Sequence, residues 1–319
     1  MESLVLTLIK LILFFSALHH LPPPPTAISS RTTTFPKQAL PTKSGYLPIN
    51  STTGSAIFYV FYEAKNPNNS SLSQTPLLIW LQGGPGCSSM TGNFYELGPF
   101  LVTSSQRQNV EHLTLKPNPH SWNRLFGLLF LDNPIGTGFS IASTPEEIPR
   151  DQNAVAKHLS IAIKKFIASD STFESRPIYI TGESYAGKYV PSIGYYIVKR
   201  NANLSVSKRV NLIGLAIGNG LTDPSWVKKM KWGGMKEYLE SKREVWVVKG
   251  EIAGYVQKWR SLSSVVVLGA GHLVPADQPL NSQAMIEDWV LEKGLPVAKF
   301  VEVSGHGGAN RAALEPNEK

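Results

Sequence analysis

Short apolar runs alternate with segments of helical periodicity along most of this chain. Six runs rich in β-branched and aromatic residues are predicted to be strands, at positions 56–62, 77–81, 125–131, 177–180, 212–217 and 265–268. Three segments are predicted to be helices, at positions 151–168, 185–198 and 283–291. The first of them carries Val155, Leu159, Ala162, Ile163 and Phe166 on one face. This alternation predicts a mainly parallel sheet with helices on both of its faces.

A hairpin is predicted late in the chain. Two apolar runs at 244–248 and 252–256 flank Lys249-Gly250, and glycine permits the positive φ that a tight hairpin turn requires.

The two ends of the chain differ in composition from the part between them. An apolar run at the start, followed by four prolines, is typical of a signal peptide, which we place at 1–27. We expect the Pro/Thr/Ser-rich segment 28–43 to be mobile and the tail 301–319 to be disordered. The globular domain is then expected to cover 44–300. The first run is too short and interrupted to predict stable membrane association.

The composition fits a globular enzyme and argues against nucleic acid as a partner. Hydrophobic residues make up 42% of the 319 residues and charged residues 17%, enough apolar surface for one large core. The net charge is +8, but the basic residues are scattered and are not interleaved with aromatic residues. We therefore expect no nucleic-acid partner. No cluster of His or Cys has metal-ligand spacing, so neither a metal nor a cofactor is predicted.

The segment 178–187 carries the strongest chemical signal. A short β-forming run ends in Gly-Glu-Ser184-Tyr-Ala-Gly, and a helical pattern follows at once. Strand, sharp turn and helix in this order are typical of a nucleophile elbow, which presents a serine to a base. The match alone is weak because serine and glycine are common in turns, and Ala186 stands where glycine is usual.

Two other segments strengthen this interpretation. Gly-Gly-Pro-Gly at 83–86 follows a predicted strand, and such a turn exposes backbone N–H groups that can hold an oxyanion. His272 lies between glycine-rich positions after another predicted strand, which leaves its imidazole open. The order of oxyanion loop, serine and histidine is that of α/β-hydrolases.

With these residues in view, the chain resembles the serine carboxypeptidases, in particular the secreted plant group. Six motifs occur in the order of the family, spanning about residues 44 to 292. They are WLQGGPGCSS at 80–89, ELGP at 96–99, LDNPIGTGFS at 131–140, GESYAGKYVP at 182–191, IGNGLTDP at 217–224 and GAGHLVPADQP at 269–279. The resemblance implies an α/β-hydrolase fold, and it implies that Asp132 in the third motif is structural.

The resemblance also implies a role for each matched position. Ser184 is the implied nucleophile and His272 its general base, with the N–H groups of Gly84 and Tyr185 as the oxyanion hole.

A second set of four matched residues corresponds to the site that binds the C-terminal carboxylate of the substrate: Gln82, Gly83, Glu96 and Glu183. Gln82 departs from the asparagine usual in the family and carries the same amide on a side chain that is one methylene longer. Two carboxyl groups held together share a proton, and the protonated pair donates hydrogen bonds to the carboxylate of a peptide.

The triad aspartate has no counterpart here. The family carries a cap, further strands and that aspartate between the IGNGLTDP motif and the histidine. In this chain Pro224 runs almost directly into sequence that resembles the part after the aspartate. We expect an internal deletion near 223–226, which removes the cap region and part of the C-terminal sheet. Asp223 and Asp277 both match positions outside the triad.

The leading hypothesis is a serine carboxypeptidase acting on the C-termini of peptides or proteins, with activity reduced or lost because the aspartate is absent. An acyltransferase using acyl glucose esters, or a non-catalytic secreted peptide-binding protein, are the alternatives. We expect a location in the secretory pathway, extracellular or vacuolar.

Four residues are relevant to a protein of the secretory pathway: three candidate glycosylation sites and one cysteine. Asn50, Asn69 and Asn203 begin glycosylation acceptor triplets. Cys87 is the only cysteine, so no disulfide forms within the chain. We expect a small buried residue behind the oxyanion loop; the alternative is a cysteine whose disulfide partner was lost with the missing segment.

Overall fold

The computed structural model describes residues 36–68, 71–107, 110–222 and 231–293, with the short strands at 300–301 and 313–314. The chain divides into two compact units, Met1–Gln38 and Ala39–Lys319, and all strands and α-helices described below lie in the second. The predicted signal peptide, residues 28–35 of the segment 28–43 and most of the tail lie outside the described residues. Within the described residues, no helix is both long and apolar enough to cross a membrane.

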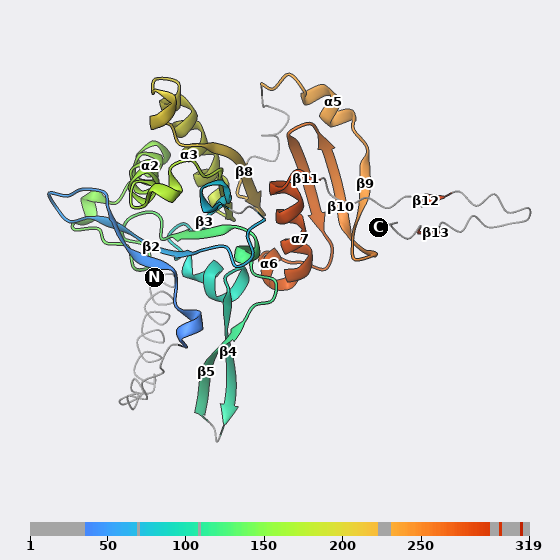
Figure 1. Ribbon diagram of the computed structural model, residues 1–319, viewed down its shortest axis with the longest axis horizontal. Coiled ribbons are helices and arrows are strands. Elements are labelled where there is room, and N and C mark those ends of the chain that lie inside the picture. The colour runs from blue at the N-terminus through green and yellow to red at the C-terminus, as the bar shows by residue number, and fades with distance from the viewer. Residues whose placement is uncertain are drawn as a thin grey trace, which may run out of the picture. The chain divides into compact units, whose positions relative to one another are not determined.

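Six strands form the central sheet, in the order β1-β2-β6-β3-β7-β8 (Figure 1). Their bounds are β1 Lys43–Pro48, β2 Ala56–Tyr62, β6 Gly127–Leu131, β3 Leu77–Leu81, β7 Ile178–Glu183 and β8 Leu212–Gly218. The first two pairs are antiparallel and the remaining three pairs, from β6 to β8, are parallel. The sheet is therefore mainly parallel, as predicted.

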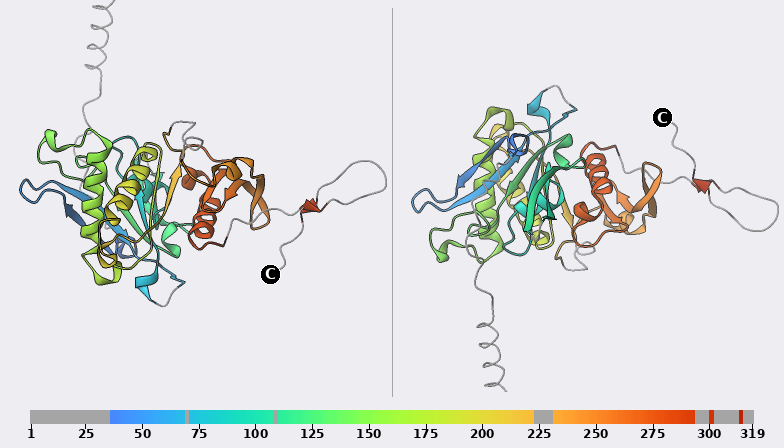
Figure 2. Two further views of the ribbon diagram at one scale, coloured as in Figure 1. Left: turned by 90° about the horizontal axis from the view of Figure 1, so that it is seen from above. Right: turned by 90° about the horizontal axis from the view of Figure 1, so that it is seen from below.

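Helices cover both faces of this sheet. Helices α2 (Gln152–Ile167) and α3 (Ala186–Asn201) lie on one side, and α7 (Pro279–Val290) lies on the other (Figure 2). Successive side chains of β3 point alternately into the hydrophobic cores on the two faces of the sheet. Leu77, Ile79 and Leu81 pack with α2 and α3, while Leu78 and Trp80 pack with α7. Because both faces are covered, every position of such a strand is apolar.

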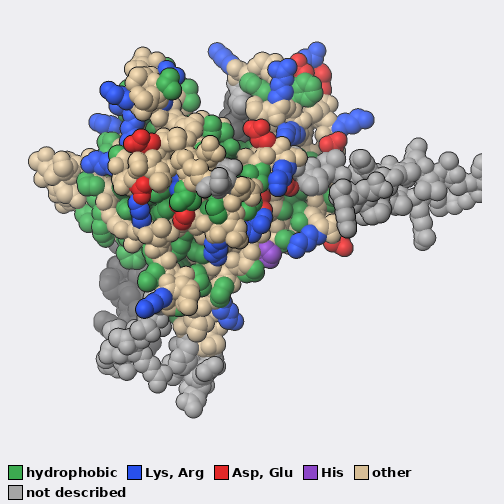
Figure 3. Space-filling view, viewed as in Figure 1, with side chains coloured by type: hydrophobic (Ala, Val, Ile, Leu, Met, Phe, Trp, Pro, Cys, Tyr) green, Lys and Arg blue, Asp and Glu red, His purple; other side chains and the backbone are tan. Residues whose placement is uncertain are grey.

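The predicted amphipathic helix is confirmed as α2. Asp151 caps its N-terminus by accepting a hydrogen bond from the Ala154 N–H at 2.9 Å. The predicted face of five residues is buried against the sheet. Charge is distributed as the sequence indicated, with Lys and Arg scattered over the face shown in Figure 3.

The predicted hairpin is also confirmed, but it belongs to a second sheet. Strands β9 (Arg243–Val248), β10 (Glu251–Trp259) and β11 (Leu262–Val267) form a separate antiparallel sheet in the order β11-β10-β9. Lys249 and Gly250 have φ of 51° and 85°, the conformation of a type I′ turn. The core of this sheet contacts α7 through Met285.

Both sheets end in open strands. β8 is an edge of the central sheet and β11 is an edge of the second. Ile213 and Leu215 on β8 are 52% and 40% exposed, and Val266 on β11 is 43% exposed. Unpaired backbone groups beside exposed apolar residues are unusual for a parallel sheet. This is the condition expected if strands between β8 and β11 are missing.

Several elements were not predicted. The strand β1 and the hairpin of β4 (Phe100–Arg107) and β5 (Val110–Pro117) carry polar residues along much of their length, which weakens the apolar signal. The remaining elements are short: η1 Lys37–Ala39, η2 Leu72–Gln74, η3 Gly92–Glu96, η4 Trp122–Arg124, η5 Pro145–Glu147, η6 Ser171–Phe173, η7 Val206–Lys208, α5 Met235–Glu240, α6 Val274–Asp277, β12 Phe300–Val301 and β13 Ala313–Leu314.

Candidate active site

Ser184 lies at the sharp turn between β7 and α3, with a φ of 61°. Its N–H donates to the Gly218 carbonyl at 3.0 Å, and its own carbonyl accepts from the N–H groups of Gly187 and Leu221 at 2.9 and 2.8 Å. A left-handed conformation at a residue with a side chain costs free energy and persists only when its surroundings hold it. These three hydrogen bonds hold Ser184 in the geometry of a nucleophile elbow.

Small residues around the elbow are required by close backbone approach. A Cβ atom at Gly182 would lie 2.6 Å from the Ala186 Cβ, and one at Gly187 would lie 2.8 Å from the Leu221 nitrogen. Since real Cβ contacts are longer than this, neither position accepts a side chain without displacing its neighbours. The sharp turn at Ser184 therefore depends on glycine at both positions.

The loop after β3 lies directly against the elbow. A Cβ atom at Gly83 would lie 2.5 Å from the Tyr185 nitrogen and 2.8 Å from the Ser184 Cβ. Gly84 follows with a φ of 106°. Within the described residues, the N–H groups of Gly84 and Tyr185 donate no hydrogen bond. Two free donors next to a serine are what an oxyanion hole requires.

Asp132 fixes this loop from behind. Its buried carboxylate accepts hydrogen bonds from the Ser88 hydroxyl at 2.7 Å, the Ser89 N–H at 2.7 Å and the Phe139 N–H at 2.9 Å. Burial nevertheless raises the pKa of Asp132. The carboxylate joins two loops that are more than 40 residues apart in the chain, which is a structural role.

The two predicted carboxyl groups meet in the interior beside the elbow. Gln82 joins them, because its Nε2 donates to Glu96 Oε1 at 3.3 Å and to Glu183 Oε1 at 3.2 Å. The Trp80 indole donates to Gln82 Oε1 at 2.8 Å and so fixes the orientation of the amide. The glutamine that replaces the usual asparagine therefore reaches both carboxyl groups.

Burial changes the acidity of this pair. Glu96 and Glu183 are 1% and 2% exposed. Burial raises the pKa of Glu96 to about 7, whereas burial, reinforced by the charge of Glu96, raises the pKa of Glu183 to about 9. A hydrogen bond between the two carboxyl groups adds to the rise in the pKa of Glu183 and opposes the rise in the pKa of Glu96. The pair consequently holds a proton at neutral pH.

The loop that follows β8 holds the backbone of the histidine loop through Asn219. Asn219 has a φ of 42°, and its Nδ2 donates to the carbonyl groups of Gly271 at 2.9 Å and His272 at 3.0 Å. The residues on either side of Asn219 hold Ser184, as described above. The segment 218–221 thus connects the serine and histidine loops. Sequence reasoning missed Asn219, although an asparagine between two glycines after a strand was a signal for it.

We expect Asn219→Gly to loosen the histidine loop without disturbing its own backbone, because glycine tolerates the positive φ. Two hydrogen bonds worth roughly 0.5–1.5 kcal/mol each are removed, so hydrogen exchange of the amides at 269–272 should become about ten- to hundredfold faster. Asn203→Gly, which removes one exposed asparagine far from the loop, is the control. Unchanged exchange in the Asn219 variant would contradict this role.

The catalytic acid is the component that the structure does not supply. Within the described residues, neither the Ser184 hydroxyl nor the His272 imidazole has a hydrogen-bond partner. The Asp277 carboxylate accepts from the Gly271 N–H at 2.6 Å instead. Asp223 lies outside the described residues. Across the described ranges, no group of three or more His, Cys, Asp or Glu residues is arranged to hold a metal ion.

The remaining predicted positions are the three glycosylation acceptors and the single cysteine. Asn50 and Asn203 are exposed, and Asn69 lies outside the described residues. Cys87 is a free, exposed thiol, so the prediction that it is buried was wrong. The reason is that residues 84–87 project from the end of the sheet and are exposed together.

Comparison with known proteins gives one family. The family model described as serine carboxypeptidase matches residues 33–225 and 224–292, in two segments that meet at Pro224-Ser225. "Serine carboxypeptidase-like 50" of Arabidopsis thaliana is 37% identical and covers 84% of this chain and 91% of its own length. That alignment runs over 417 positions, which exceeds the 319 residues of this chain, so it must place gaps here.

Other relatives match only in part. "Serine carboxypeptidase S10 family member 1" of Dictyostelium discoideum is 42% identical over 57% of this chain and 40% of its own length. Among solved structures, a prohormone-processing carboxypeptidase from Saccharomyces cerevisiae is 30% identical, with a TM-score of 0.47, over 62% of this chain and 45% of that one. The chain therefore spans less than half of the length of these two proteins.

Proposed function

This chain belongs to the serine carboxypeptidase family, and from that premise we propose that it acts on the free C-terminus of peptides through an acyl-enzyme at Ser184. We place it in the secretory pathway, outside the cell or in the vacuole. Membership of a family does not by itself decide the substrate or the location of a protein.

The observation that supports an exopeptidase best is the pair of buried carboxyl groups beside the elbow. Glu183 directly precedes Ser184, and Gln82 directly precedes the oxyanion loop, so the pair lies at the end of the sheet where Ser184 is presented. A proton held between Glu96 and Glu183 provides a donor for the terminal carboxylate of a substrate. An endopeptidase has no need of such a group.

In the proposed reaction, His272 accepts the proton of the Ser184 hydroxyl while the oxygen attacks the last peptide carbonyl. The N–H groups of Gly84 and Tyr185 hold the oxyanion. His272 then protonates the departing amine, which leaves an acyl-enzyme that water hydrolyses. Without an acid partner, the imidazolium that forms at His272 is poorly stabilised, and turnover is slow.

A non-catalytic role in peptide binding is the second candidate. It is favoured by one observation, the absence of a hydrogen-bond partner for the His272 imidazole in the described residues. Covalent labelling of Ser184 by an organofluorophosphonate separates the two functions, since an inactive site does not react. Assays with blocked dipeptides and with acyl glucose esters separate peptidase from acyltransferase activity.

We expect the binding of a peptide with a free C-terminal carboxylate to weaken above about pH 7, where the pair of Glu96 and Glu183 loses the first of its two protons and gains a charge that repels the carboxylate. The loss should approach tenfold per pH unit, as for any ligand that needs the protonated form. The amidated peptide is the control and should bind with little pH dependence. Parallel profiles for acid and amide, measured by isothermal titration, would contradict the role of the pair.

The same pair predicts a pH dependence of stability that needs no activity. Both folded-state pKa values lie above the ordinary 4.5, so the folded protein binds more protons than the unfolded chain between about pH 5 and 9. The contribution of the pair is therefore present at low pH and is lost as pH rises, with a slope of about 1.4 kcal/mol per pH unit for each extra proton. In Glu183→Gln, the free energy of unfolding, measured by urea titration at several pH values, should fall less steeply as pH rises.

A further inference from the structure

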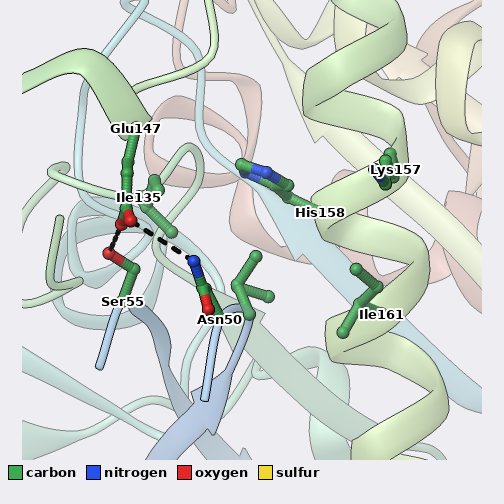
Figure 4. Close-up of a pocket in the computed structure, with 8 residues that line it drawn as sticks. Asn50, Ser55, Ile135, Glu147, Lys157, His158 and Ile161 are labelled. Atoms are coloured by element: carbon green, nitrogen blue, oxygen red, sulfur yellow. Dashed lines mark hydrogen bonds between the residues drawn. The ribbon is translucent and has the colours of Figure 1, made fainter. Parts of the chain in front are cut away.

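A cavity of about 390 Å³ lies outside the candidate active site, between the β1–β2 turn, η5 and α2 (Figure 4). Its lining combines apolar and polar groups, including Ile49, Ile161, Glu147, Lys157 and His158. This volume falls within the range of small-molecule sites, and a mixture of apolar walls with a few polar groups is typical of them. The proposed peptidase mechanism does not use any of these residues.

Asn50 stands at the edge of this cavity and begins the acceptor triplet Asn50-Ser51-Thr52. Its side chain is exposed but held in one orientation. Oδ1 accepts a hydrogen bond from the Thr52 N–H at 3.0 Å, and Nδ2 donates to Glu147 Oε1 at 3.3 Å. Glu147 also accepts from the Ser55 hydroxyl. Since Nδ2 carries two hydrogens and uses one, the other position can carry a sugar.

His158 projects from α2 into the cavity (Figure 4). Neither ring nitrogen has a hydrogen-bond partner in the described residues, and only Nδ1 is sealed from solvent. An unpaired N–H is costly to bury, so the proton is favoured on Nε2, which leaves an accessible donor. Burial also lowers the pKa of His158, which keeps the ring neutral. Neutral imidazole, lysine and carboxylate groups together suit the hydroxyl and acetamido groups of a hexosamine.

From this placement we propose that the cavity holds the first N-acetylhexosamine of a glycan attached to Asn50. Attachment breaks the bond between C1 of the sugar and its lipid pyrophosphate carrier, joins C1 to Nδ2 and releases one amide proton. The second amide hydrogen continues to donate to Glu147. The pyranose ring and the methyl of the acetyl group pack on Ile49 and Ile161, while His158 and Lys157 donate to sugar oxygens. The inference rests on the proposed secretory location.

The test uses the full chain secreted from a eukaryotic host, with glycan release from the native protein by a peptide N-glycosidase. We expect the glycan at Asn50 to be released at least tenfold more slowly than the glycan at Asn203, and both to be released equally fast after denaturation. Thr52→Ala, which removes the triplet but keeps Asn50, should lower the melting temperature, whereas Ser205→Ala at the other triplet should not.

Variants of His158 test the contact itself. His158→Leu, or His158→Gln if the first fails to fold, should bring the release rate at Asn50 close to that at Asn203. An unmodified Asn50 beside a modified Asn203, equal native release rates, or protection unchanged in the His158 variants would each overturn the inference alone. Absence of glycan at every triplet would overturn it together with the proposed location.

Discussion

Ser184→Ala should abolish labelling by an organofluorophosphonate and leave only residual peptide hydrolysis. Loss of the serine costs on the order of 10⁶ in kcat in a complete serine protease, and loss of the aspartate alone about 10⁴. Because the triad acts as a unit, removing Ser184 from a chain that already lacks the acid should cost the difference, on the order of 10². Intact-protein mass spectrometry and a dipeptide assay measure the two effects.

The matched control for that experiment is Ser192→Ala, which removes another serine hydroxyl from α3. Ser192 is partly exposed and its hydroxyl donates only to the Lys188 carbonyl at 2.7 Å, so labelling and hydrolysis should equal those of the unmodified chain. Labelling that survives in the Ser184 variant, or equal hydrolysis, would remove Ser184 from the mechanism.

Turnover of this chain should be lower by about 10⁴ or more than that of an active full-length member of the family. The reason is that no carboxylate of the described residues contacts the His272 imidazole, whose tautomer and charged form the aspartate normally stabilises. Steady-state kinetics with blocked dipeptides, at equal concentrations of active serine, measure the ratio.

The same preparation should also be poorly stable and prone to associate. Ile213 and Leu215 are exposed on β8, and β8 and β11 are both open edges, which are templates for pairing with another chain. Sedimentation at several concentrations measures the association. A monomer that unfolds cooperatively, with turnover within tenfold of the full-length enzyme, would contradict both expectations. Another residue would then have to supply the acid, and Asp223 would be the first to replace.

Local patterns in the sequence determined much of this protein. Short apolar runs and helical spacing located β2, β3, α2 and β8 to within a residue or two, because apolar side chains recur where an element packs against its neighbours. The type I′ hairpin at Lys249-Gly250 followed from two turn residues between β-forming runs. The elbow at Ser184 was recognisable because a sharp turn requires small residues at fixed spacing.

Tertiary structure decided what depends on residues far apart in the chain. Gln82 bonds to Glu183 across 101 positions, and Asn219 to His272 across 53, and no local pattern encodes either contact. The raised pKa values follow from burial that only the assembled core creates. Likewise, the composition of the apolar run that forms β11 does not indicate which of the two sheets it joins. Its place in a separate sheet was decided by which strands are available to pair with it.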